Sequence, residues 1–270
     1  MIVDTVPARR TGGLWVFRVI AALVVAICLL PLVAVVLAAV TGDSGTVADL
    51  AHTVLGRYAA TTGLLVLLVG AGTFVIGTLT AWLVTMCEFP GRRWLEIALV
   101  LPLAFPAYVL AYAYTPVLHH PGLVQSTLRT LTGWGPRGYW FPEIRSLGGA
   151  AAMLTLVLYP YVYLLARAAF LQQSASAFIA ARALGKAPWQ AFLRVTLPMA
   201  RPAIVSGVLL AVMETIADFG TVAHFGVQTY ATGIYSSWIT YGDRAAAAQL
   251  ALGLLAFALL LVALDRLTRG

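Results

Sequence analysis

Two acidic residues, Glu214 and Asp218, interrupt an otherwise strongly apolar stretch of the chain. They are four residues apart, so a helix would place both carboxylates on one face. A carboxylate inside a membrane is costly, and it usually faces a cavity, a partner or a transport pathway. We therefore expect Glu214, Asp218 and the nearby Thr221 to line or gate a pathway, where carboxylate oxygens could contact a hard cation in transit without holding it as a stable metal site. The alternative is that the carboxylates lie at the outer end of a span and contact water or backbone groups.

Two tyrosines and two histidines are further candidates for a role in binding. Tyr108 and Tyr112 are also four residues apart, and they either line the pathway or belong to the aromatic belt found at membrane interfaces. His119 and His120 are adjacent and would not point the same way on a helix, so we interpret them as a solvated pair rather than a metal site. The four histidines are scattered and form no nucleophile–base set, so an enzyme is not predicted.

The composition is that of an integral membrane protein. Of the 270 residues, 61% are hydrophobic and 10% are charged, and the mean hydropathy is +0.91. Typical soluble domains are about a quarter charged. The net charge of +7 is explained better by Lys and Arg in cytoplasmic loops than by binding to nucleic acid. Cys28 and Cys87 lie in or at the end of apolar runs and indicate neither a disulfide framework nor a metal site.

Six apolar runs are long enough to cross a bilayer, which takes about 20 helical residues. Because lipid offers no partner for unpaired backbone groups, the spans are expected to be helical, and the predicted fold is all-α. The first run is too long for a signal peptide and is expected to remain as a span. Prolines such as Pro102 and Pro106 are expected to kink the helices. The predicted spans are 14–40, 59–86, 95–115, 147–170, 203–225 and 246–265.

The loop charges predict the orientation of these spans. With the N-terminus inside, twelve of the 17 Lys and Arg residues fall on the inner side. Cytoplasmic loops carry an excess of these residues, so both termini are predicted to be cytoplasmic. The loop between the fourth and fifth spans is then cytoplasmic as well.

That loop contains a basic stretch, Phe178–Ile204, which predicts two short helices hinged at Gly185. Pro188 suits the first turn of the second helix, and Leu197-Pro198 is expected to end it. The second helix would carry an apolar stripe, Trp189, Phe192, Leu193 and Thr196. Such a segment is either a docking surface or a positively charged loop at the membrane surface.

The spacing of residues in this stretch resembles the EAA loop of ABC-importer permeases. The pattern is Ala180-Ala181, three residues, Gly185, nine residues, Val195, one residue, and Leu197-Pro198. In that family the loop forms the coupling helices that sit in a groove of the cytoplasmic ATPase. Ile179 stands where the family has Glu. The resemblance implies a coupling loop over residues 174–202, with these contact residues: Ala180, Ala181, Arg182, Gly185, Trp189, Phe192, Val195, Leu197 and Pro198.

A second stretch, METIADFGTVAHFGVQTYATGIYSSW followed by GDRAAAAQLA, resembles the ferric-iron importer permeases. In those proteins two homologous six-helix halves are usually fused, and the similarity is to the first half. The resemblance implies a type I ABC-importer permease fold in one domain, 1–270, located in the bacterial inner membrane. The chain would then be a half that pairs with another, a split gene product or a fragment.

The same resemblance implies three partners besides the lipid bilayer. They are a dimer of cytoplasmic ABC ATPases, a second permease half that is identical or homologous, and a substrate-binding protein at the outer surface. The long outer loop, 116–145, is expected to form short interfacial helices where that protein would bind. The sequence lacks a GxxxxGK[ST] phosphate loop, so ATP and Mg are expected in the ATPase, and no cofactor is expected on this chain.

Two alternatives remain for the function. Within the same architecture, the substrate could be thiamine, phosphonate, sulfate or a polyamine. In another class, an ion-coupled secondary transporter would use Glu214 and Asp218 as ion or proton carriers. Such a transporter would not need the loop around Gly185.

Overall fold

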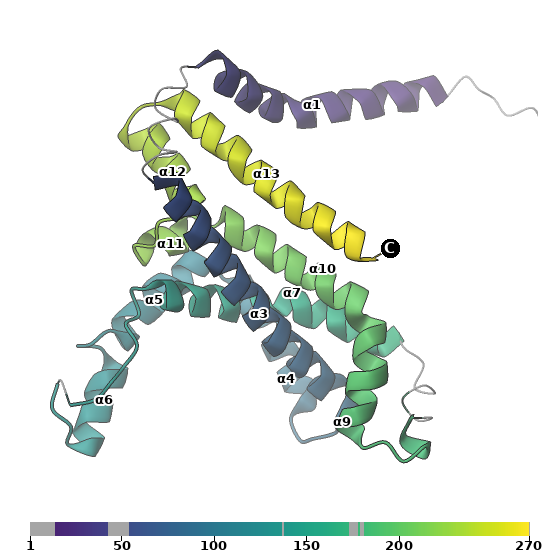
Figure 1. The fold of residues 1–270 in the computed structure, drawn as a ribbon. Coiled ribbons are helices and arrows are strands. Elements are labelled where there is room, and N and C mark those ends of the chain that lie inside the picture. The colour runs from purple at the N-terminus through teal and green to yellow at the C-terminus, as the bar shows by residue number, and fades with distance from the viewer. Residues whose placement is uncertain (1–13, 43–53, 137, 173–177, 179–180, 270) are drawn as a thin grey trace, which may run out of the picture.

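The structure, a computed structural model, describes residues 14–42, 54–136, 138–172, 178 and 181–269. Within these ranges the regular structure is entirely helical (Figure 1). Five helices are long and apolar enough to cross a membrane, and one bent pair of helical segments would bring the number to six. The prediction of an all-helical protein with several membrane spans is therefore confirmed. The count of six spans and the cytoplasmic location of both termini stay predictions.

The helical segments follow one another along the whole described chain. Four of the predicted spans, 14–40, 59–86, 147–170 and 246–265, correspond to α1, α3, α7 and α13. The segments are α1 Leu14–Thr41, α3 Gly56–Met86, α4 Arg92–Ala98, η3 Leu101–Ala104, α5 Ala107–Leu118, α6 Leu123–Thr132, α7 Leu147–Gln172, α9 Pro188–Ala191, η4 Phe192–Thr196, α10 Leu197–Ala217, α11 Gly220–His224, α12 Tyr230–Tyr235, η5 Ser236–Thr240 and α13 Arg244–Arg269.

Helix α7 is the centre of the bundle, with α3 and α10 packed against it (Figure 1). Two glycines allow this close packing. A Cβ atom on Gly77 of α3 would lie 2.6 Å from Cβ of Val162, and one on Gly207 of α10 would lie 2.7 Å from Cα of Val162. Val162 is fully buried between them. Small residues at helix crossings are the usual means of close packing in lipid, where no hydrophobic force drives helices together.

Helix α1 stands apart from this bundle, and its C-terminal end meets the start of α13 (Figure 1). The side-chain amide of Gln249 in α13 donates a hydrogen bond to the carbonyl oxygen of Ala39, at a distance of 2.8 Å. Most of the apolar side chains of α1 are exposed in this chain alone. A helix of this composition is expected to be covered by lipid or by protein.

The predicted third span, 95–115, is not one continuous helix. Helix α4 and the short η3 segment are followed by α5, and the axes of the two parts differ by 99°. The break falls at Phe105, which has an extended backbone, and at Pro106, which precedes the first residue of α5. Proline lacks the N–H that would continue the helix and disfavours helical geometry in the residue before it.

The expectation that Leu197-Pro198 ends a helix is wrong. The chain is helical from Pro188 through Ala217, a segment of 30 residues. The π-helical turn η4 precedes Pro198, and the N–H of Leu197 donates to the carbonyl of Phe192. In an ordinary α-helix the proline ring would clash with the carbonyl four residues earlier, and the wider π turn relieves that clash.

Candidate functional site

Three of the five predicted pathway residues border one cavity. Glu214 near the end of α10, Asp218 directly after α10 and Tyr108 at the start of α5 line a space of about 460 Å³. Helix α7 forms the third wall. Glu214 is exposed and Asp218 is half-buried. The other described lining residues are apolar or phenolic and include no basic side chain: Leu103, Ala104, Phe105, Pro106, Ala107, Leu154, Val157, Leu158 and Tyr161.

Asp218 does not continue the helix that carries Glu214. Helix α10 ends at Ala217, and Asp218 adopts an extended backbone. Its carboxylate accepts hydrogen bonds from the N–H groups of Thr221 and Val222, at 2.9 and 3.2 Å, and from the Thr221 hydroxyl at 3.0 Å. The predicted span 203–225 is therefore divided after Ala217. Asp218 and the buried Thr221 hold the turn that leads into α11.

The two carboxylates therefore differ in what they can do. Within the described residues, no hydrogen bond or ion pair engages the carboxylate of Glu214, whereas that of Asp218 already accepts three hydrogen bonds. An unengaged carboxylate at a cavity wall is free to contact a substrate. Glu214 is the stronger candidate of the pair.

Tyr112 lies away from the cavity and contacts α11 instead. Its ring centroid is 4.0 Å from that of His224, and Nε2 of His224 lies 2.9 Å from the hydroxyl of Thr115. A Cβ on Gly220 would lie 2.8 Å from Cβ of Tyr108, so glycine is what allows α11 to approach α5. The contact between His224 and α5 was not predicted, because a sequence does not show which helix a lone histidine packs against.

The first part of the coupling loop forms the predicted turn at Gly185. Ala180 and Ile179 lie outside the described residues, and residues 181–183 are helical. Gly185 has a φ of +79°, the left-handed conformation that glycine adopts without strain. The N–H of Lys186 donates to the carbonyl of Ala181 at 3.2 Å, and Nη1 of Arg182 donates to the carbonyl of Lys186 at 2.7 Å. These contacts close the helix and fix the turn.

The second part of the loop has an exposed side and a buried side. Trp189 and Leu193 are 51% and 41% exposed, whereas Phe192 is 2% exposed. The ring of Phe192 lies 4.9 Å from that of Trp82 in α3 and 6.2 Å from that of Phe170 in α7, measured between centroids. Phe192 thus attaches the loop to the bundle and is not available to a partner.

We call seven exposed residues of this loop the coupling face. They lie on both sides of the Gly185 turn, and they combine apolar and basic side chains. Of the remaining predicted contact residues, Pro198 is exposed, and Ala181, Val195 and Leu197 are half-buried. The coupling face consists of Arg182, Leu184, Gly185, Lys186, Trp189, Leu193 and Arg194.

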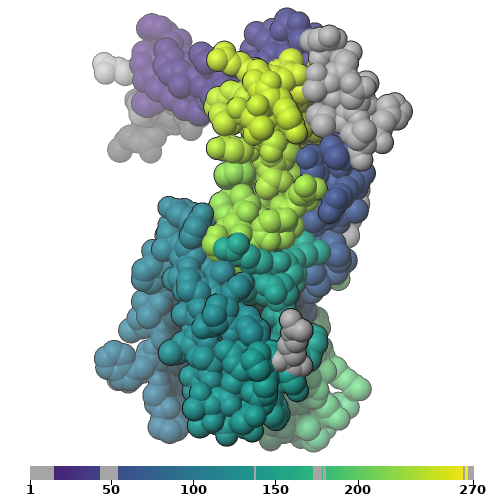
Figure 2. Space-filling view, turned by 90° about the vertical axis from the view of Figure 1, so that its left-hand side faces the viewer, coloured from purple at the N-terminus to yellow at the C-terminus, as the bar shows by residue number. Residues whose placement is uncertain are grey.

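The outer loop is ordered around helix α6. The guanidinium of Arg129 donates to the hydroxyl of Tyr139 at 2.8 Å and to the carbonyl of His120 at 3.0 Å. The Tyr139 hydroxyl in turn donates to the side-chain oxygen of Gln125 at 2.8 Å. Figure 2 shows this face of the molecule, with α5 and α6 in blue and teal at its lower part. Of the expected short interfacial helices, the structure contains α6.

His119 and His120 border a small pocket beside this network, about 100 Å³ in volume. Nε2 of His120 lies 2.9 Å from the carbonyl oxygen of Pro136. In the part of the chain that the structure describes, no three His, Cys, Asp or Glu side chains gather closely enough to hold a metal ion.

The comparisons with known proteins agree on one family. The family model described as "Binding-protein-dependent transport system inner membrane component" matches residues 86–269. The chain is 27% identical over 261 residues to the Fe(3+)-transport system permease protein FbpB 2 of Haemophilus influenzae, covering 97% of this chain and 47% of that protein. It therefore spans about half the length of that relative.

Two further similarities concern a relative and a solved structure. The molybdenum transport system permease protein ModB of Escherichia coli strain K12 is 28% identical over 193 residues, which cover 68% of this chain and 80% of that protein. A bacterial ABC transporter involved in the import of the acidic polysaccharide alginate has a chain of the same fold. The TM-score is 0.75 at 17% identity, with 94% of each chain covered.

Proposed function

Because the chain belongs to the family of binding-protein-dependent transport system inner membrane components, we propose that it is a membrane-spanning permease subunit of an ABC importer. One observation carries this proposal. The helical segment Pro188–Ala217 runs without a break from the coupling face to Glu214 at the cavity. A force applied at one end of a continuous helix moves the other end as a rigid body.

The proposed partner at the coupling face is a cytoplasmic ABC ATPase dimer, which would hold ATP and Mg. Trp189 and Leu193 offer exposed apolar contacts, and Arg182, Lys186 and Arg194 surround them with positive charge. An exposed aromatic residue with basic neighbours is typical of an interface that docks into a groove. This surface would lie on the cytoplasmic side of a bacterial inner membrane, with a substrate-binding protein and a second permease half completing the importer.

We further propose ferric iron as the substrate. The cavity is lined by the carboxylates of Glu214 and Asp218 and by the phenol of Tyr161, and its described lining has no basic residue. Oxygen ligands of this kind suit a hard cation, and a field of negative charge disfavours an oxyanion. Release of the ion is compatible with this site, since the structure gives it one unengaged carboxylate instead of a full ligand set.

An oxyanion is the second candidate substrate. The similarity to a molybdenum transport permease supports it, and that match covers more than two thirds of the chain. Thiamine, phosphonate, sulfate and polyamines remain alternatives of the same architecture. A secondary transporter that uses Glu214 and Asp218 as carriers has less support, because it gives no role to the coupling face.

Uptake into proteoliposomes tests the proposal. The chain is reconstituted with its second half, ATPase and binding protein, and radioactive ferric iron, molybdate and sulfate are offered in turn. We expect ATP-dependent uptake of ferric iron alone. ATP-dependent uptake of molybdate or sulfate would reject iron and keep the importer. Uptake that persists without the ATPase and follows a proton gradient would reject the importer.

A further inference from the structure

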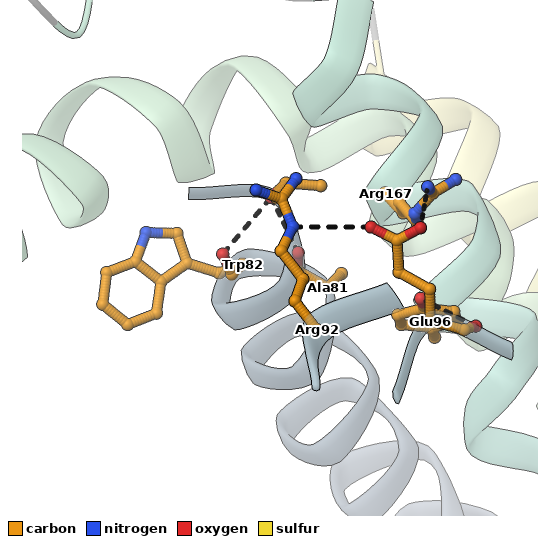
Figure 3. Close-up of polar contacts among 7 residues, drawn as sticks. Ala81, Trp82, Arg92, Glu96 and Arg167 are labelled. Atoms are coloured by element: carbon orange, nitrogen blue, oxygen red, sulfur yellow. Dashed lines mark hydrogen bonds and ion pairs between the residues drawn. The ribbon is translucent and has the colours of Figure 1, made fainter. Parts of the chain in front are cut away.

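A carboxylate at the end of the bundle opposite the cavity joins two helices that are far apart in the sequence. Oε2 of Glu96 in α4 lies 3.2 Å from Nη2 of Arg167 in α7, and Oε1 lies 3.4 Å from Nε of Arg92 (Figure 3). The Tyr163 hydroxyl donates to the backbone carbonyl of Glu96 at 3.3 Å. Helix α4 is thus joined to α7 by one ion pair and one hydrogen bond, beside the apolar packing of Leu95 against the cluster that contains Tyr163.

Of the two ion pairs of Glu96, one lies within α4 and the other connects α4 with α7. Arg92 is four residues earlier on the same helix, so its pair with Glu96 is local to α4. Arg167 is 71 residues later, so its pair joins two helices. The side chain of Glu96 is 25% exposed and that of Arg167 is 32% exposed, so solvent screens this contact only in part. Nε of Arg167 is buried without a hydrogen-bond partner among the described residues. Loss of Glu96 would also remove the negative charge that compensates the positive charge of this guanidinium.

The α7 end of this contact lies next to the coupling loop. Phe170 is three residues after Arg167, and its ring centroid lies 6.2 Å from that of Phe192. Phe192 belongs to the same continuous helix as the exposed Trp189. The coupling face is therefore connected to the end of α7 through packed aromatic rings.

The α4 end of the contact leads to the cavity. Helix α4 ends at Ala98 and is followed by η3, which begins at Leu101. Residues 103–108 then form the cavity wall that faces Glu214. The carbonyl of Pro102 accepts the N–H of Phe105, which keeps the chain compact up to the break before Pro106. Moving α4 would move this wall.

We propose that Glu96 is a positioning residue, which transmits motion from the coupling loop through Arg167 and α4 to the cavity wall at residues 103–108. This inference rests on the proposed function. It adds a second route to the one through α10, so that both sides of the cavity are driven from one docking site. The pair Glu96–Arg167 is the single charged link of this route within the described residues.

The test follows the movement of the wall directly. Spin labels at Phe105→Cys and Leu210→Cys, both exposed positions, report the distance between the wall and α10 in the assembled complex, with Cys28 and Cys87 replaced by serine. We expect ATP with vanadate to shift this distance, and Glu96→Ala to abolish most of the shift. A full shift in Glu96→Ala would overturn the proposal, as would a wild-type complex that closes around ATP with no shift.

A matched set of variants distinguishes the Glu96–Arg167 ion pair from the local pair of Glu96 with Arg92. Arg167→Ala should behave like Glu96→Ala, and the double variant should be no worse than either, because both remove one contact. Arg92→Ala removes the local pair on α4 and should keep the full shift. If Arg92→Ala abolishes the shift equally, the carboxylate acts within α4 and the proposed link is wrong. Glu96→Gln replaces Glu96→Ala if the latter fails to assemble.

Transport provides the second readout. We expect the amount of ferric iron moved per ATP hydrolysed to fall at least about fivefold in Glu96→Ala, which is the lower end of typical coupling between two sites. This ratio should be higher in Arg167→Lys than in Arg167→Ala, because lysine keeps the positive charge. If the distance shift occurs in the wild-type complex and is lost in Glu96→Ala, but the wild-type complex moves no ferric iron, the proposed substrate is contradicted. The inference about Glu96 then still holds. A complex whose ATPase never engages the chain contradicts both.

Discussion

The ring of Phe192 lies 4.9 Å from the ring of Trp82, at an interplanar angle of 38°. This contact attaches the coupling loop to the end of α3, and Phe170 of α7 completes the cluster. The loop is therefore fixed to two helices of the bundle by a side chain that is almost fully buried. In the proposed function, motion of a partner docked on this loop would pass into the bundle through these packed rings.

Removing this ring should destabilise the protein. Phe192→Ala leaves a cavity among Trp82, Phe170 and Trp189, and we expect a loss of about 3–5 kcal/mol in the free energy of unfolding. Thermal unfolding in detergent measures it. Leu193→Ala is the matched control, since that residue is 41% exposed and should cost much less. Equal losses in the two variants would contradict the buried position of Phe192.

The Gly185 turn should resist a side chain for reasons of backbone conformation alone. A Cβ on Gly185 would meet nothing within 4 Å, but its φ of +79° costs an L-residue roughly 1–2 kcal/mol. We expect Gly185→Ala to weaken binding of the ATPase by about tenfold, as that cost converts into affinity. Titration of the complex with purified ATPase measures it. Gly56→Ala, which also meets nothing within 4 Å and has no positive φ, should leave affinity unchanged.

The close crossing of α7 and α10 should be intolerant of larger residues. In Gly207→Val the new side chain would overlap the backbone at Tyr161 and Val162, where a Cβ already lies 2.7 Å from Cα. We expect a cost of at least about 1–3 kcal/mol, which folding yield and melting temperature report. Gly63→Val, at an open position of α3, should cost no stability, since valine is a better helix former than glycine. Normal stability of Gly207→Val would show that the two helices can separate.

Substitution of the two carboxylates at the cavity should have different effects on stability and on transport. Glu214→Gln should reduce uptake of ferric iron strongly with little change in melting temperature, since no described residue forms a hydrogen bond or ion pair with that carboxylate. Asp218→Ala removes the hydrogen bonds to Thr221 and Val222, and we expect it to cost about 0.5–2 kcal/mol of stability. Uptake per folded complex and thermal unfolding, measured on both variants, distinguish these roles. Full uptake by Glu214→Gln would show that Glu214 has no role in the pathway.

Much of the fold could be predicted because long apolar runs identify membrane-spanning helices. The long apolar runs around Leu23 and Leu65 have no other stable state in lipid. The left-handed turn at Gly185 was equally readable, since a glycine between two helix-forming segments is a common helix end. The break before Pro106 was foreseeable as a kink, although its 99° angle depends on packing.

What the sequence did not reveal depends on contacts between distant residues. Pro198 was expected to end a helix, and it lies inside one because a π turn precedes it. Phe192 was expected in a docking stripe, but Trp82 and Phe170 bury it. Glu96 was not singled out, because its partner Arg167 is 71 residues away in the sequence. Periodicity describes a helix by itself and does not say which face a neighbour covers.

The π turn at Phe192–Thr196 also determines the angle between the two ends of the long helix. A π turn holds one residue more than an α turn, and each residue of an α-helix turns the chain by about 100°. Deleting one residue there would restore a regular helix and rotate everything beyond it by about that angle. Glu214 would then leave the cavity while Trp189 kept its place. The extra residue sets the angle between the coupling face and Glu214, so in the proposed function an insertion or deletion in this segment would uncouple the two even where every contacting side chain is retained.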